Sequence, residues 1–242
     1  MQPVIPDYIT EPILWFIAVV VFFLLGVFFF IRYRKSETEA RAFFSGTTVF
    51  MLSYVSYRTI EIIRRYFVTG DYYDIEKWWY QGGPAITDNS LYLRLAFLFI
   101  SWIGIAYFYF RIESTILQKK TFYVLTIASL LKLVLNPLMY FPDTFPFSTI
   151  EIVNTILFIL AGFFPICLFA FYAIRDYVDK GKIWAVLSLG MLAFIIGEVG
   201  SNPEAYMITG GMNRVFVAYG SPLMVILGGI LLYLALRRLY EV

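Results

Sequence analysis

The 242-residue chain contains no histidine and only one cysteine, and these absences exclude several kinds of chemistry. Without histidine, the chain cannot build a His-ligated zinc or haem site or a Ser-His pair for nucleophilic catalysis. Cys167 has no second thiol for an intrachain disulfide, so we interpret it as a small apolar side chain. Charged residues make up only 15% of the chain. The sequence predicts neither a metal site nor a bound cofactor, and we expect a protein that is not an enzyme.

Apolar residues, in contrast, are abundant: 60% of the chain is hydrophobic and 20% is aromatic. A bilayer core of ~30 Å needs about 20 apolar residues per helix, and seven stretches are that long. They are continuous rather than alternating, which favours helices over a β-barrel. We predict an all-α, polytopic membrane protein with a single domain over 1–242, a seven-transmembrane helix bundle. The predicted spans are roughly 12–31, 42–65, 91–110, 121–140, 149–174, 183–200 and 214–236.

Basic residues are concentrated in alternate connections, which predicts how the chain is oriented. One set of connections contains Arg32, Arg34, Lys35 and Arg41, then Arg111, Lys119 and Lys120, then Arg175, Lys180 and Lys182, and finally Arg237 and Arg238. The positive-inside rule makes this set cytoplasmic. The N-terminus is then outside and the C-terminus cytoplasmic, and we expect the plasma membrane. Asp7 and Glu11 precede the first span, so we expect it to stay as a helix rather than to be cleaved as a signal peptide.

The longest connection, roughly 66–90, falls on the predicted outer side and contains Trp78, Trp79 and Tyr80. Tryptophan and tyrosine favour the boundary between membrane and water, so we interpret this connection as lying on the outer leaflet. A cap over a binding site is the alternative. The predicted cytoplasmic connections are all short, so a signal would have to pass to a separate protein partner.

Charged residues inside a span are costly, at ~2.5 kcal/mol or more each, and they usually pair or line a wet cavity. They are Arg58, Glu61, Arg64, Arg65, Arg94, Lys132, Glu151 and Glu198. Arg58, Glu61 and Arg65 follow one stripe of the second helix, and Arg64 can pair with Glu61 one turn away. With a rise of ~1.5 Å per residue, five helices bring these charges to the predicted outer half, Arg58 and Lys132 lying deepest.

Two interpretations of these charges compete. In the first, Arg58, Glu61, Arg94, Glu151 and Glu198 form an ion-pair network that fixes helix packing, while Arg64 and Arg65 extend to the outer headgroups. In the second, the groups Arg58, Glu61, Arg65, Arg94, Lys132, Glu151 and Glu198 surround a ligand-binding pocket that opens outward. Basic residues outnumber acidic ones, which favours a carboxylate or phosphate as the ligand.

Proline and glycine give a second, weaker signal. Pro137, Pro165 and Pro222 each remove a backbone donor and should bend a span. The pair Gly228-Gly229, with Ala235 further on, predicts a close contact between helices rather than chemistry.

Three classes of function remain. No aspartate lies inside a span, which argues against an intramembrane aspartyl protease, and the last span has no lysine for a retinal Schiff base. The overall plan is similar to the seven-helix sensor regions that precede microbial histidine kinases, an analogy of architecture without a matching motif. We therefore expect a receptor-like or sensory protein that binds a small ligand, for which the charges favour an anion. A transporter or channel for a small solute and a structural subunit of a membrane complex are the alternatives. Membrane lipid is an expected partner and nucleic acid is not.

Overall fold

The structure is a computed structural model that describes residues 10–68, 88–118, 120–138, 147–176, 178, 180–200 and 216–239. In these residues every regular element is helical, which confirms the all-α prediction. The elements are α1 (Thr10–Lys35), α2 (Thr38–Ile63), η1 (Arg64–Val68), α4 (Asp88–Thr115), α5 (Val124–Leu138), α6 (Phe147–Phe158), η2 (Ile159–Phe163), α7 (Phe164–Arg175), α8 (Gly181–Gly200), η3 (Phe216–Gly220) and α10 (Ser221–Arg238). The three η elements are wide, π-type turns that continue a helix.

Seven helical stretches lie where the sequence predicts apolar spans, because η1 extends α2, η2 joins α6 to α7, and η3 leads into α10. Five described helices are long and apolar enough to cross a membrane: Thr10–Lys35, Tyr92–Thr115, Ile152–Arg175, Gly181–Gly200 and Ser221–Arg238. α5 is short, with 15 residues, and α2 carries the charged stripe. The chain is therefore a helical membrane protein.

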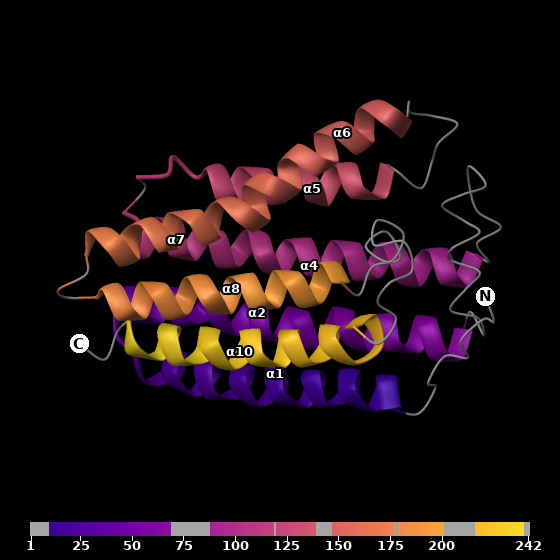
Figure 1. The fold of residues 1–242 in the computed structure, drawn as a ribbon, viewed down its shortest axis with the longest axis horizontal. Coiled ribbons are helices and arrows are strands. Elements are labelled where there is room, and N and C mark those ends of the chain that lie inside the picture. The colour runs from indigo at the N-terminus through magenta and orange to yellow at the C-terminus, as the bar shows by residue number, and fades with distance from the viewer. Residues whose placement is uncertain are drawn as a thin grey trace.

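Successive stretches run in alternating directions along the long axis of the molecule (Figure 1). Each stretch packs against its neighbours in the chain, and α10 returns to contact α1. The bundle thus has two ends. The basic end is where α1 finishes with Arg32, Arg34 and Lys35 and α10 finishes with Arg237 and Arg238. The opposite end, where α2 finishes and α4 begins, is called the network end.

The core lies along the inner face of α1 and is largely aromatic. Trp15, Phe22 and Phe29 recur every seventh residue, so they share one face of α1, and all three are buried. Phe22 contacts Tyr54 of α2, with ring centroids 3.9 Å apart, and also Phe194 of α8 at 5.8 Å. The outward-facing side chains of α1 are apolar as well, as expected of a helix that faces lipid.

Glycine brings α8 and α10 into close contact, as predicted for Gly228. A Cβ atom added at Gly228 would lie 2.6 Å from the backbone nitrogen of Phe194, and one at Gly190 would lie 2.9 Å from that of Leu232. No larger side chain fits such gaps without moving one helix. Small residues at both positions therefore set the distance between these helices.

Two predicted proline bends coincide with wide turns. η2 comes just before Pro165 and η3 just before Pro222. Pro165 has no N–H to donate to the carbonyl of Ala161, four residues earlier. The hydroxyl of Tyr109 on α4 donates to that carbonyl instead, at 2.5 Å. The interrupted helix is thereby tied to α4.

Candidate functional site

Three charged side chains near the end of α2 lie inside the bundle at the network end. Arg58 and Glu61 are on the last turns of α2, and Arg64 begins η1. All three side chains are buried. Residues three apart differ by about 60° in direction around the helix axis, so the three side chains spread over one side of the helix. A helix that buries three charged side chains in a membrane protein needs partners for them on other helices.

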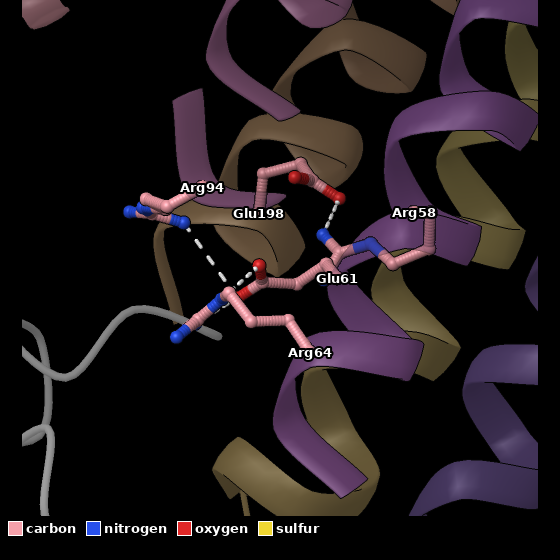
Figure 2. A network of polar contacts seen from close by, with 5 residues as sticks. All are labelled: Arg58, Glu61, Arg64, Arg94 and Glu198. Atoms are coloured by element: carbon pink, nitrogen blue, oxygen red, sulfur yellow. Dashed lines mark hydrogen bonds and ion pairs between the residues drawn. The ribbon is translucent and has the colours of Figure 1, made fainter. Parts of the chain in front are cut away.

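Arg58 joins three helices. Its guanidinium lies over the ring of Trp15 on α1, with Cζ 3.9 Å from the ring centroid. Its Nη2 atom donates to Oε1 of Glu198 on α8 (Figure 2). The Arg58 side chain is only 2% exposed, whereas that of Glu198 is 21% exposed. The pair therefore connects the buried interior to a more accessible edge of the bundle.

Glu61 accepts from the arginine one turn further along its own helix. Nε and Nη2 of Arg64 donate to the two carboxylate oxygens of Glu61, at 2.9 and 2.7 Å. Arg94 on α4 approaches the same carboxylate, with Nη1 3.6 Å from Oε1 of Glu61 (Figure 2). Glu61 thus links α2 to α4. We call Arg58, Glu61, Arg64, Arg94 and Glu198 the polar network.

The structure corrects the expectation that Arg64 extends to the headgroups. Its side chain turns inward and is 8% exposed, because the two-pronged bond to Glu61 holds it there. A bidentate arginine–carboxylate pair is both strong and directional. An Arg64 side chain that extended to the headgroups would lose these two hydrogen bonds.

Lys132, predicted as part of the same site, has a different set of contacts. Its ammonium donates to the side-chain oxygen of Asn154 at 2.7 Å and to the backbone carbonyl of the same residue at 3.0 Å. The rings of Trp102 and Phe158 lie 4.9 and 5.3 Å from Nζ. Lys132 therefore lies between α4, α5 and α6. The sequence interpretation missed Asn154, whose only signal was its position on an apolar span.

Two of the predicted site residues lie outside what the structure describes. The backbones of Arg65 and Glu151 belong to η1 and α6, but their side chains are not among the described ones. The connection that contains Trp78, Trp79 and Tyr80 is also outside the described residues.

Glu113 is a buried acid that the sequence interpretation overlooked. It lies near the end of α4, and its carboxylate accepts hydrogen bonds from the backbone N–H groups of Leu125 and Thr126, at 3.1 and 3.0 Å. The hydroxyls of Thr121 and Thr126 also donate to it, at 2.7 and 2.6 Å. Glu113 thus caps the N-terminus of α5, where a negative charge is favourable. A glutamate followed by two threonines near a helix start was the available signal.

The polar network combines three guanidiniums and two carboxylates, so its five groups carry a net charge of +1. It also retains hydrogen-bonding capacity: Nε of Arg58 and Nε1 of Trp15 are buried and have no hydrogen-bond partner among the described residues. Both atoms are donors, and they belong to residues in direct contact, since Cζ of Arg58 lies 3.9 Å from the ring centroid of Trp15. An arrangement of this kind can accept an oxygen atom of a small anion. Among the described residues, no three His, Cys, Asp or Glu side chains gather as metal ligands would.

Comparison with known proteins gives no family for this chain: no family model matches it, and neither curated proteins nor solved structures provide a significant match. Arguments about its function therefore depend on the site itself.

Proposed function

We propose that the protein is a receptor-like, sensory membrane protein that binds a small anion at the polar network. In this proposal all seven helical stretches span the plasma membrane, with the N-terminus outside and the C-terminus in the cytoplasm. The network end then faces outward, where a ligand can reach it. The ligand is a carboxylate or a phosphate, and a separate protein partner receives the signal.

The observation that supports this function best is the stacked pair of Arg58 and Trp15. Each residue has a buried donor without a partner among the described residues, and such a donor costs about 1–3 kcal/mol when it stays unsatisfied. One ligand oxygen can accept from both. The negative charge of the ligand then shares the Arg58 guanidinium with Glu198, which accepts from Nη2, and this weakens the contact between α2 and α8. That coupling is a physical route from ligand binding to helix movement.

The test is a matched pair of tryptophan substitutions. Trp15→Phe removes the Nε1 donor but keeps an aromatic face for Arg58. Trp184→Phe makes the same change in the first turns of α8, at the basic end, where Nε1 of Trp184 is also buried and has no partner in the described part of the chain. Purified protein is heated in mild detergent with small carboxylates or inorganic phosphate, and the unfolding midpoint is followed.

We expect at least one of these anions to raise the unfolding midpoint of the wild type and of Trp184→Phe. Trp15→Phe should need about tenfold or more anion for the same effect, because a hydrogen bond to a charged group contributes about 1.5–3 kcal/mol. Equal responses in both variants would argue against the site. An absence of any anion effect would favour the alternative function, a structural subunit.

The structural alternative is favoured by one specific observation, the direct pairing within the polar network. Arg58 with Glu198 and Arg64 with Glu61 hold helices together without any ligand. In that case the network fixes packing within a larger membrane complex. A stable protein partner that co-purifies in mild detergent, together with indifference to anions, would support this function.

A further inference from the structure

A second polar site lies at the basic end, far along the helices from the polar network. It is a pocket of about 530 Å³ between the end of α1, the start of α2 and the end of α4. Its lining includes Tyr33, Ser36, Glu37, Arg41, Tyr107 and Arg111. These side chains are polar or aromatic in a protein whose surface is otherwise rich in aliphatic residues, so the pocket is chemically distinct from its surroundings.

Arg111 is held in a defined position on the wall of this pocket. Its Nε and Nη2 atoms donate to the hydroxyl of Tyr107, at 3.0 and 2.8 Å, and that hydroxyl is 3.2 Å from Oγ of Ser45. Its aliphatic stem passes over Gly46, where an added Cβ would lie 2.6 Å from Cβ of Arg111. The guanidinium is therefore positioned before any ligand arrives, which reduces the entropy cost of binding.

Arg41 faces the same pocket from α2. Its guanidinium lies 5.1 Å from the ring of Tyr33, and the side chain is exposed. Within the described part of the chain, neither Arg41 nor Arg111 forms an ion pair with a carboxylate. Glu37 is the one acidic residue of the lining, against two arginines. The charge of the pocket therefore favours an anion, and paired arginines suit the oxygens of a phosphate.

Exposed aromatic rings border this polar pocket on the side toward the middle of the bundle. Phe30 on α1 is exposed, and its ring lies 6.1 Å from that of Tyr33. Phe110 on α4 is exposed as well, with Cζ of Arg111 5.4 Å from its ring. A polar pocket bordered by apolar rings, at the depth where a membrane helix ends, matches a ligand with a charged head and an apolar tail.

We infer that this pocket binds the phosphate group of an anionic phospholipid. Arg41 and Arg111 hold the phosphate oxygens, and the acyl chains lie over Phe30 and Phe110. Inorganic phosphate offers the same oxygens without the apolar tail, so it is the other source of this chemistry. The inference does not depend on the function of the polar network, which lies at the opposite end of the helices.

The test measures lipid binding to purified protein in detergent by native mass spectrometry. Phosphatidylglycerol, phosphatidylcholine and inorganic phosphate are titrated separately. Arg41→Gln removes one exposed charge of the pocket, and Arg34→Gln removes an exposed charge at the same end that does not line it. Glu37→Gln removes the acidic residue. Because Arg41 and Arg34 are both exposed, neither substitution should affect folding.

We expect phosphatidylglycerol to bind more tightly than phosphatidylcholine. Arg41→Gln should weaken this binding about fivefold, since one basic residue contributes about 1 kcal/mol to attraction for an anionic lipid. Arg34→Gln should have a smaller effect, and Glu37→Gln should strengthen binding. Binding of inorganic phosphate that depends on Arg41 would identify a soluble phosphate as the source. Equal effects of Arg41→Gln and Arg34→Gln, or binding weakened by Glu37→Gln, would overturn the proposal.

Discussion

At the scale of single residues, the structure assigns partners to charges that would be costly alone in a membrane. Arg58 combines a carboxylate on another helix with an aromatic ring beneath it. Both contacts favour the charged guanidinium, the first by direct attraction and the second through the negative face of the ring. Lys132 shows a different solution, with an amide and two aromatic rings around its ammonium.

Breaking the pair of Arg58 and Glu198 should cost more than removing both charges. Arg58→Met leaves the Glu198 carboxylate without this partner, and we expect a loss of up to about 3 kcal/mol of unfolding free energy. The double substitution Arg58→Met with Glu198→Met should restore part of that stability, since neither charge of the pair remains buried. Denaturant unfolding in detergent micelles compares the three proteins. With Glu198→Met alone measured as well, a loss in the double variant equal to the sum of the two single losses would show that the two residues do not interact.

At the scale of helices, the sequence pattern allowed the elements to be located but not the way they pack. The seven apolar stretches correspond to seven helical stretches because a helix satisfies its own backbone hydrogen bonds locally. A close helix contact at Gly228 was predicted, while its partner helix α8 and the matching role of Gly190 were not. One glycine permits a close contact, but only the arrangement in space shows which residue lies opposite.

The glycine contact between α8 and α10 can be tested with a matched pair of substitutions. Gly228→Ala places a methyl group 2.6 Å from a backbone nitrogen, so the helices must separate, and we expect a loss of about 1–3 kcal/mol. Gly162→Ala serves as the control, because its nearest neighbour would be at 3.5 Å, an ordinary contact. Unfolding midpoints in detergent provide the comparison. Similar midpoints for both variants would contradict the close packing.

At the scale of the whole molecule, the two ends of the bundle differ in chemistry. The polar network lies at one end, and the basic helix ends and the pocket lined by Arg41 and Arg111 lie at the other. In the proposed orientation, each end meets a different aqueous compartment. In the proposed function, a signal that starts at the network travels along the helices, and α2 reaches both ends, from Thr38 beside the pocket to Arg58 and Glu61.

The proposed orientation can be measured by labelling single cysteines in a Cys167→Ala background. Lys182→Cys places a thiol at an exposed position of the basic end. Gln81→Cys places one in the long connection that the sequence predicts to be outside. A membrane-impermeant maleimide should label Gln81→Cys in intact cells and should label Lys182→Cys only after the membrane is opened. The reverse pattern would show that the orientation is the opposite of the proposed one. Equal labelling of both cysteines in intact cells would place both sites on the same side, which contradicts an odd number of spans between them.

The sequence by itself determined the helical class, the positions of the apolar stretches and the concentration of basic residues at one end. These properties are local, since hydropathy and helical hydrogen bonding act between residues close in the chain. It also singled out all five members of the polar network in advance, because any charge in an apolar span is conspicuous.

Only the tertiary structure decided which charges meet. Arg58 and Glu198 are separated by 140 positions, and no local pattern selects one acid over another at that distance. The inward turn of Arg64, the contact of Lys132 with Asn154 and the pocket formed by three helix ends arise in the same way. Each depends on the rotation of one helix against another, which is determined by side-chain packing throughout the bundle.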